Sequence, residues 1–268
     1  MFVAVTAMSI GLALNSASAQ SYAEVSAAIS AYEKGDCDTA TKSFTSLSER
    51  GEGYSSFVLV TMYESGKCLQ RSEENASHMY LLAATRGVPK AQFAMAKRYT
   101  SGTGVSKNMP EAIRWLKEAA KHDLEPEAKL LLAAYMLEGT HLPRDADQIG
   151  KLSLFQATQG DPFAQFLAAG AYLEGYNRLP DGTPDVQAAL HWLRQSAQQG
   201  HSDAQAYLGR ILLGGRYVKR DVKEAQKWLC LAAKQDNGNA IQTLNREFLR
   251  QQRSARRNSD PDLMIQNC

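Results

Sequence analysis

The chain has 268 residues, of which 44% are hydrophobic and 22% are charged, and its formal net charge is +2. This hydrophobic content is ample for a packed core and argues against disorder. A net charge so close to zero argues against nucleic acid or anionic lipid as the main partner, and the length allows one large domain or two small ones.

An apolar, uncharged stretch at residues 2–14 is followed by the small-x-small motif Ala17-Ser18-Ala19. We therefore expect residues 1–19 to be a secretory signal peptide, although the usual basic start is missing and the true start can lie upstream. A membrane anchor is the weaker alternative, because about 13 apolar residues are too few to span a bilayer. The predicted location is periplasmic or secreted, without membrane insertion after signal cleavage.

From residue 53 onward the sequence repeats itself, which is typical of stacked helical hairpins. The related segments start at Ser55, Ala91, Ala128, Ala164 and Ala204. Within one unit, Ala91, Met95 and Tyr99 recur at steps of four residues, which predicts one face of a helix. Ala112, Trp115 and Ala119 recur at steps of three and four residues, which predicts the partner helix.

Glycines follow the predicted helices, where a left-handed residue costs little. They are Gly66, Gly102, Gly139, Gly175 and Gly215 after the first helices, and Gly87, Gly160 and Gly200 after the second. One hairpin cannot bury both of its faces but stacked hairpins can, so we predict an all-α, right-handed solenoid superhelix of antiparallel helix pairs. The predicted parts of a single solenoid at 20–254 are a partial cap at 20–52, full units at about 53–88, 89–124, 125–161, 162–201 and 202–237, and a capping helix at 238–254, before a tail at 255–268.

At these residues the chain resembles the Sel-1-like repeat family, which is related to the tetratricopeptide repeats. The family pattern AxxxLGxxYxxGxGVxxDxxxAxxWxxxAAxxG is matched best over residues 91–120 and 204–233. The third unit departs most, with Met136 in place of Tyr and Leu152 in place of Trp. The resemblance covers roughly residues 25–250 and implies a solenoid that binds other proteins in envelope signalling control, exopolysaccharide regulation or host contact.

Residues that could support catalysis are scattered. The histidines, which are His78, His122, His141, His191 and His201, fall in different units and form no HxxxH or HxxE arrangement. There is no GxSxG elbow or phosphate loop, and Gly102-Thr103-Gly104 lies at a repeat turn. We therefore expect no catalytic residues, no cofactor and no metal, and a protein that is not an enzyme.

The four cysteines, Cys37, Cys68, Cys230 and Cys268, allow three pairings and contain no CxxC motif. Cys37 and Cys68 lie in the predicted turns of adjacent units, so a disulfide between them would tie the N-terminal cap to the first full unit. Cys268 could fold back to Cys230. The alternative for that pair is a free or intermolecular thiol.

The first helices of such repeats line the concave face, which usually takes the ligand. By register, we expect the partner-binding residues of this face to be Phe57, Thr61, Phe93, Lys97, Leu130, Phe166 and Arg210. The family pattern also favours an aromatic residue at these positions, so a half-core role is the alternative. The extra loop residues 176–185 are a second candidate contact, or a harmless length variant.

The predicted function is a non-catalytic protein–protein interaction module of the bacterial cell envelope, which scaffolds or regulates a partner protein of unknown identity. One alternative is a cell-wall or β-lactam hydrolase-like enzyme, although the chain lacks the two cysteines per unit of family members linked to penicillin binding. Another is a secreted effector that acts on host proteins.

Overall fold

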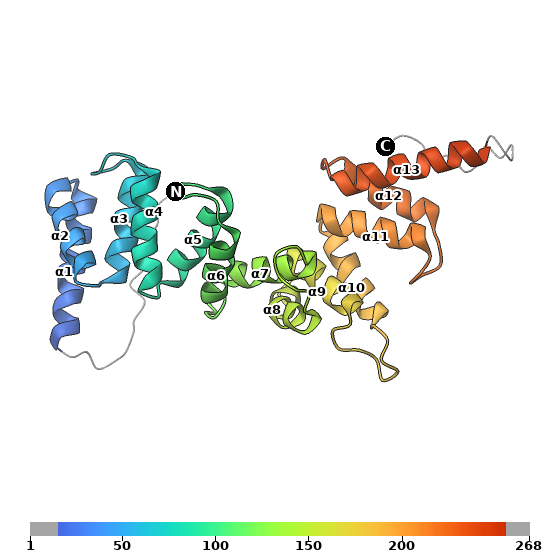
Figure 1. Cartoon of the computed structure of the whole chain (residues 1–268), viewed down its shortest axis with the longest axis horizontal. Coiled ribbons are helices and arrows are strands. Elements are labelled where there is room, and N and C mark those ends of the chain that lie inside the picture. Colours follow the sequence, from blue (N-terminus) through green and yellow to red (C-terminus); the bar gives the residue numbers. More distant parts are fainter. Residues whose placement is uncertain (1–15, 256–268) are drawn as a thin grey trace. The chain divides into compact units, whose positions relative to one another are not determined.

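The computed structural model describes the backbone of residues 16–255 and the side chains of residues 22–250. These residues form thirteen helices and no strand, so the prediction of an all-α fold is confirmed. Within this part of the chain, no helix has the length and apolar character needed to cross a membrane. Most of the predicted signal peptide and of the tail lies outside the described residues. The helices (Figure 1) are α1 (Ser16–Lys34), α2 (Cys37–Glu49), α3 (Gly53–Ser65), α4 (Glu73–Thr85), α5 (Pro89–Ser101), α6 (Met109–Ala119), α7 (Pro126–Glu138), α8 (Ala146–Thr158), α9 (Pro162–Glu174), α10 (Val186–Gln198), α11 (Ser202–Gly214), α12 (Val222–Ala233) and α13 (Gly238–Ala255).

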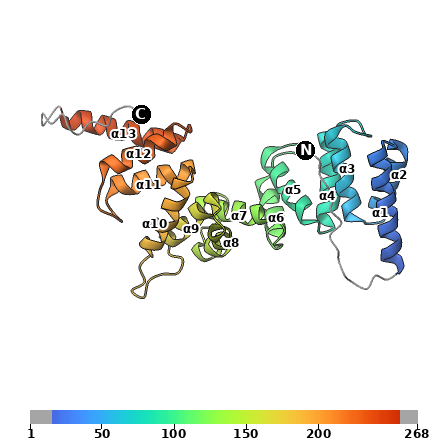
Figure 2. The ribbon, with the colours of Figure 1, turned by 180° about the vertical axis from the view of Figure 1, so that it is seen from behind.

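The helices form two compact units. Unit 1 contains α1–α6 and ends at Glu125, and unit 2 begins at Pro126 and contains α7–α13. Inside each unit, every helix packs against the next one along the chain, which is the stacking of helix pairs that the repeat predicts (Figures 1 and 2). The continuity of a single solenoid through residues 20–254 stays a prediction.

Polar residues begin most of the helices, and left-handed glycines end the first helix of each full pair. Gly66 and Gly102 follow α3 and α5 with φ of +73° and +83°, a region in which a side chain is strained. All eight glycines predicted to close helices have positive φ, so this prediction is confirmed. The side chains that accept a backbone N–H at a helix start are those of Asp36, Glu52, Ser72, Asn108, Asp145, Asp161, Asp185, His201, Asp221 and Asn237.

Small residues set the distance between paired helices. A Cβ atom added to Gly209 in α11 would lie 2.6 Å from Cγ of Leu229 in α12, well inside van der Waals contact. Ala96, Ala133 and Ala169 hold the corresponding position in other pairs and are all buried. Small residues at these positions let the paired helices pack closely, and at Gly209 the Leu229 side chain of the opposite helix fills the space beside the backbone.

Buried glutamines, which the sequence analysis did not identify, join consecutive pairs. The Gln165 amide in α9 donates to the Ala157 carbonyl of α8 at 3.3 Å, and the Gln205 amide in α11 donates to the Ala197 carbonyl of α10 at 3.0 Å. Gln92 makes the same bond in unit 1. Each of these carbonyls also accepts from the backbone N–H of the glycine three residues later, so the amide adds a second hydrogen bond at the point where one pair meets the next.

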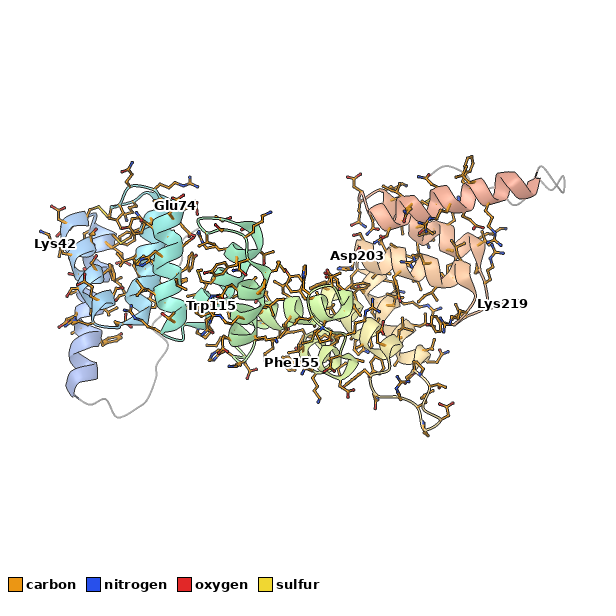
Figure 3. The ribbon with its side chains drawn as sticks, in the orientation of Figure 1. Lys42, Glu74, Trp115, Phe155, Asp203 and Lys219 are labelled. Atoms are coloured by element: carbon orange, nitrogen blue, oxygen red, sulfur yellow. A yellow bond between two sulfur atoms is a disulfide. The ribbon has the colours of Figure 1, made fainter. Side chains whose placement is uncertain are left out.

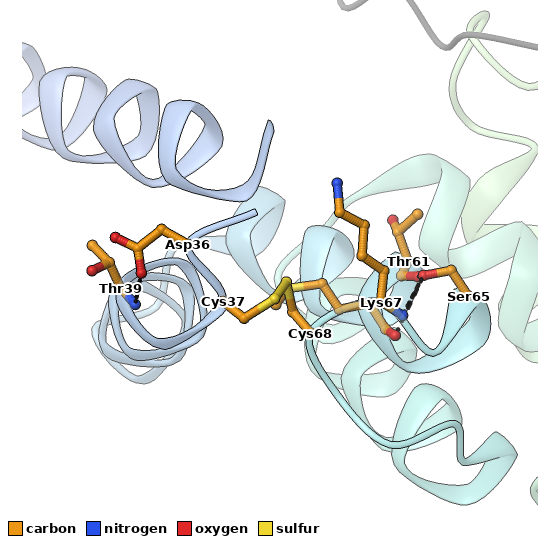
Figure 4. The surroundings of a disulfide bond; sticks show 8 residues. Asp36, Cys37, Thr39, Thr61, Ser65, Lys67 and Cys68 are labelled. Carbon is orange, nitrogen blue, oxygen red and sulfur yellow. Dashed lines mark hydrogen bonds between the residues drawn. A yellow bond between two sulfur atoms is a disulfide. The ribbon is translucent and has the colours of Figure 1, made fainter. Parts of the chain in front are cut away.

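A disulfide bond joins Cys37 and Cys68, as predicted (Figure 4). Cys37 is the first residue of α2 rather than part of a turn, and Cys68 lies in the loop after α3 with a φ of +69°. The bond spans 31 residues, and Cys68 packs against the core that α1, α2 and α3 share. The second predicted pairing, of Cys230 with Cys268, involves a residue outside the described part of the chain.

Trp115 in α6 provides a test of the core assignment, because its side chain is only 3% exposed. We predict that Trp115→Ala lowers the free energy of unfolding by roughly 3–5 kcal/mol, through the cavity that the indole leaves. The matched control is Phe155→Ala, because Phe155 in α8 is 68% exposed and its loss leaves no cavity (Figure 3). Urea unfolding followed by circular dichroism measures both, and equal losses would contradict the assignment.

The disulfide provides a second, local test. Replacing both cysteines with serine, Cys37→Ser and Cys68→Ser, should cost about 2–4 kcal/mol by freeing the loop that the bond closes. Because each pair contacts only its neighbours, hydrogen exchange should accelerate in α1 and α2 and stay unchanged in α11 and α12. Uniform acceleration throughout the chain would contradict this local role.

Candidate protein-binding groove

The first helices of the pairs in unit 2, α7, α9 and α11, line a groove of about 620 Å3 that α13 also borders. Its apolar lining consists mainly of Leu131, Leu137, Phe163, Phe166 and Leu167. Its polar lining consists of Glu138, Arg144, Glu174, Asp203, Tyr207, Arg210 and Asn239. Most of these lining residues lie on the side of a first helix that faces away from its own partner helix. Stacking of the pairs places these sides next to each other and so forms the groove.

Phe166 is at the centre of the aromatic part of the groove. Its ring meets the Tyr207 ring edge-on, with centroids 6.4 Å apart, and it stacks on the His201 ring at 5.3 Å. Phe163, one turn earlier in α9, also stacks on His201, at 5.8 Å. This cluster joins α9 to α11, so its rings form one aromatic wall of the groove.

His201 couples this wall to the start of α11. Its Nδ1 atom accepts a hydrogen bond from the backbone N–H of Ala204 at 3.3 Å, and it thus caps the helix. Burial lowers the pKa of His201, against the smaller opposing effects of Asp203 and Asp161. The neutral ring suits both roles, because a protonated Nδ1 could not accept and a cation is unfavourable at a helix N-terminus.

The charged groups along the groove are partly paired with each other. Arg144 bonds to Glu174 at 2.8 Å, and Asp203 at the start of α11 accepts from the Asn237 amide at 2.7 Å. Arg210 lies 5.8 Å from the centre of the Tyr207 ring. Burial raises the pKa of Tyr207, so its hydroxyl stays protonated at neutral pH and can donate a hydrogen bond.

The structure places two of the predicted partner-binding residues, Phe166 and Arg210, in this groove. It does not place Leu130 there, because that side chain is 6% exposed and belongs to the core. The adjacent Leu131 lines the groove instead. Successive residues of a helix point about 100° apart, so an error of one position in register exchanges a surface residue for a core residue.

The other four predicted residues, Phe57, Thr61, Phe93 and Lys97, lie on α3 and α5 of unit 1. Lysines cover their aromatic rings. Lys97 lies 5.6 Å from the centre of the Phe93 ring, and Lys90 lies 5.7 Å from that of Phe57. None of these four residues is in the lining of the groove of unit 2, and their role in binding stays a prediction.

Most of the polar lining was not predicted from the sequence. Tyr207 lies one position after Ala206, which holds the place in its repeat that Phe166 holds in the preceding one, so extending the predicted register by one residue in this repeat would have found it. Arg144 and Glu174 lie outside that register, in the loop before α8 and at the end of α9, and only folding brings them together. Nothing in their sequence context indicates this pairing.

The candidate loop at 176–185 is ordered by its own hydrogen bonds. Arg178 donates to the Gly182 carbonyl at 2.8 Å, and the Asp181 carboxylate accepts from the Thr183 hydroxyl at 2.6 Å. The Tyr176 ring packs directly on Gly150 of α8, where a Cβ atom would lie 2.6 Å from the ring. The loop is thus anchored on unit 2, and a contact role for it stays a prediction.

The lining of the groove combines apolar and charged groups. Its described lining has aliphatic, aromatic, carboxylate, guanidinium and amide groups. Two of its three carboxylates, those of Glu174 and Asp203, are engaged with neighbours. Over the part of the chain that the structure describes, no group of three or more His, Cys, Asp or Glu side chains could hold a metal ion.

The repeats match a known family model. The Sel1 repeat model matches residues 61–88, 89–124, 162–201 and 202–237, which together cover just over half of the chain. The chain belongs to the Sel1 repeat family. Sel1 repeats serve as protein-interaction modules and are generally non-enzymatic. The segment 125–161, which departs most from the pattern, is not among these four matches.

Individual Sel1 repeat proteins resemble this chain over different lengths. The exopolysaccharide production negative regulator of Rhizobium meliloti (strain 1021) is 31% identical over 164 residues, which are 56% of this chain and 58% of that protein. A Sel1 repeat protein from Oxalobacter formigenes has a similar structure, with a TM-score of 0.53, 27% identity, and coverage of 84% of this chain and 89% of that one. The protective antigen c5321 of uropathogenic Escherichia coli shares the fold, with a TM-score of 0.57 and 22% identity over 93% of this chain and 51% of that one.

His201 makes the stability of α11 dependent on pH. In the unfolded chain His201 binds a proton near the ordinary histidine pKa of about 6.5. In the folded chain its pKa is lowered, so it binds the proton only at lower pH. The stability contributed by neutral His201 is therefore complete above this pH and declines as the pH falls below it.

The urea midpoint of the native chain should thus fall more steeply below pH ~6.5 than that of His201→Asn, since asparagine caps a helix without titrating. Parallel curves for the two proteins would contradict the role of His201. The other four histidines are present in both proteins, so their effect cancels in the comparison.

Proposed function

We propose that this chain is an exported, non-catalytic Sel1 repeat module of the bacterial cell envelope, which holds a partner protein in the groove of unit 2 and thereby scaffolds or regulates it. The observation that carries the proposal is the groove itself. An aromatic wall, an apolar lining and a charged rim are the features with which proteins bind a peptide segment or a helix of another protein.

The family and its relatives support the regulatory part of this proposal. The Rhizobium meliloti relative is named as a negative regulator of exopolysaccharide production. The chain spans 58% of that relative's length, so this role comes to the present protein as a proposal. A module that regulates without catalysis needs a binding surface, and the groove provides one.

The disulfide supports the location. Disulfide bonds persist in oxidising compartments such as the periplasm and are rare in the cytosol. The Cys37–Cys68 bond therefore fits an exported protein. The apolar segment and small-residue motif at residues 1–19 fit the same location.

The groove can be blocked by one substitution. Ala134 in α7 is half-buried and lines the groove, so Ala134→Trp should fill part of it with an indole. The matched control is Ala188→Trp, because Ala188 in α10 is also half-buried and is not in the groove lining. In crosslinking pull-downs from cell envelopes, we expect a partner captured by the native chain and by Ala188→Trp to be lost from Ala134→Trp.

Circular dichroism establishes that both variants fold as the native chain does. Capture of the same partner by all three proteins would place the interaction outside the groove of unit 2. If the native chain hydrolysed a cell-wall or β-lactam substrate and Ala134→Trp did not, the groove would instead be identified as an active site.

A further inference from the structure

Arg210 lines both the groove and a second hollow of about 340 Å3 between α11 and α13. Leu213 and Gly214 line it from α11, and Arg246, Glu247 and Arg250 line it from one face of α13. Arg246 and Arg250 are four residues apart, so they lie on the same side of α13, where both are exposed. A segment that lies in the groove and extends toward α13 would therefore meet several guanidinium groups in succession.

The charges of this hollow do not balance. Its one carboxylate, that of Glu247, is nearly buried and already bonds to Arg220 at 3.2 Å and pairs with Arg250 at 3.5 Å. Arg210 and Arg246 are exposed and have no carboxylate partner among the described residues. The α13 end of the groove thus presents two guanidinium groups whose donors are available to a ligand.

The α7 end of the groove has a different character. Arg144 and Glu174 neutralise each other there, and Glu138 is an exposed carboxylate with no ion pair among the described residues. The two ends of the groove therefore carry opposite charges. An unpaired carboxylate lies on α7, the middle at Phe166 is apolar and aromatic, and unpaired arginines lie toward α13.

We propose that the partner segment held by the groove is acidic at one end, and that its Asp or Glu side chains bind Arg210 and Arg246 while an apolar stretch beside them lies against Phe166 and Tyr207. This inference rests on the proposed function and adds the chemistry and the orientation of the ligand. Guanidinium groups bind carboxylates through paired, charge-assisted hydrogen bonds, which give orientation as well as attraction. The apolar middle of the groove distinguishes such a segment from a simple polyanion.

The experiment is a selection from a phage-displayed library of random dodecapeptides on the immobilised full-length protein. Displayed peptides are fused at their C-terminus, so any acidic preference comes from side chains. We expect the selected sequences to combine Asp or Glu with an adjacent aromatic or aliphatic stretch. A fluorescent synthetic copy, amidated at its C-terminus, then measures affinity by anisotropy.

Two charge-reversed proteins are compared with the native chain. Arg210→Glu with Arg246→Glu should weaken the acidic peptide roughly tenfold or more, because two favourable ion pairs become repulsive. The control, Arg194→Glu with Lys223→Glu, makes the same change in net charge at exposed positions on α10 and α12 that do not line the groove, and should leave the affinity unchanged. A peptide with Lys in place of its acidic residues should show the opposite preference.

The outcomes separate this inference from the proposed function. Peptides that Ala134→Trp no longer binds, but that carry no acidic bias, would overturn the inference and leave the groove as the binding site. Acidic peptides that Ala134→Trp still binds, and that polyphosphate displaces, would show a general anion site and overturn the inference. If no peptide were selected more strongly by the native chain than by Ala134→Trp, both proposals would fail.

Discussion

The close approach of two helices within each pair is the constraint on which the rest of this structure depends. At Gly209 the backbone of α11 lies so near Leu229 that a single added carbon would clash at 2.6 Å. Such packing buries one side of each helix and leaves the other side without a partner. The next pair must cover that side, and the buried amides of Gln165 and Gln205 mark the places where it does so.

The stacking of one helix pair on the next also produces a surface that no single repeat has. The first helices of unit 2 each turn one row of side chains away from their partners, and the row from α7, α9 and α11 becomes one groove. Core positions are constrained by packing, whereas positions in this row are free to vary between repeats. Different side chains, those of Leu131, Phe166 and Tyr207, can therefore line one groove, although the repeats to which they belong have the same backbone fold.

His201 shows how the stability of the fold and the shape of the groove are joined. Where most other helices begin at Asp, Asn or Ser, α11 begins at a histidine whose ring also stacks on two phenylalanines of the groove. An aspartate in this position would cap the helix as well but could not support the aromatic wall. His201 thus connects the start of α11, where its ring caps the helix, to Phe166, which also contacts Tyr207.

The sequence by itself determined the all-α repeat and the helix ends at Gly66 and Gly102, and it indicated Cys37–Cys68 as one of the possible disulfide pairings. These features depend on residues close in sequence or on the same position of adjacent repeats, so a regular spacing reveals them. Only the tertiary structure decided that Leu130 is core while Leu131 lines the groove, because a rotation of about 100° between neighbouring residues separates the two environments. It also decided the meeting of Arg144 with Glu174 and of Arg210 with the face of α13. Those contacts join different repeats through side chains that do not recur, so no periodicity in the chain could predict them.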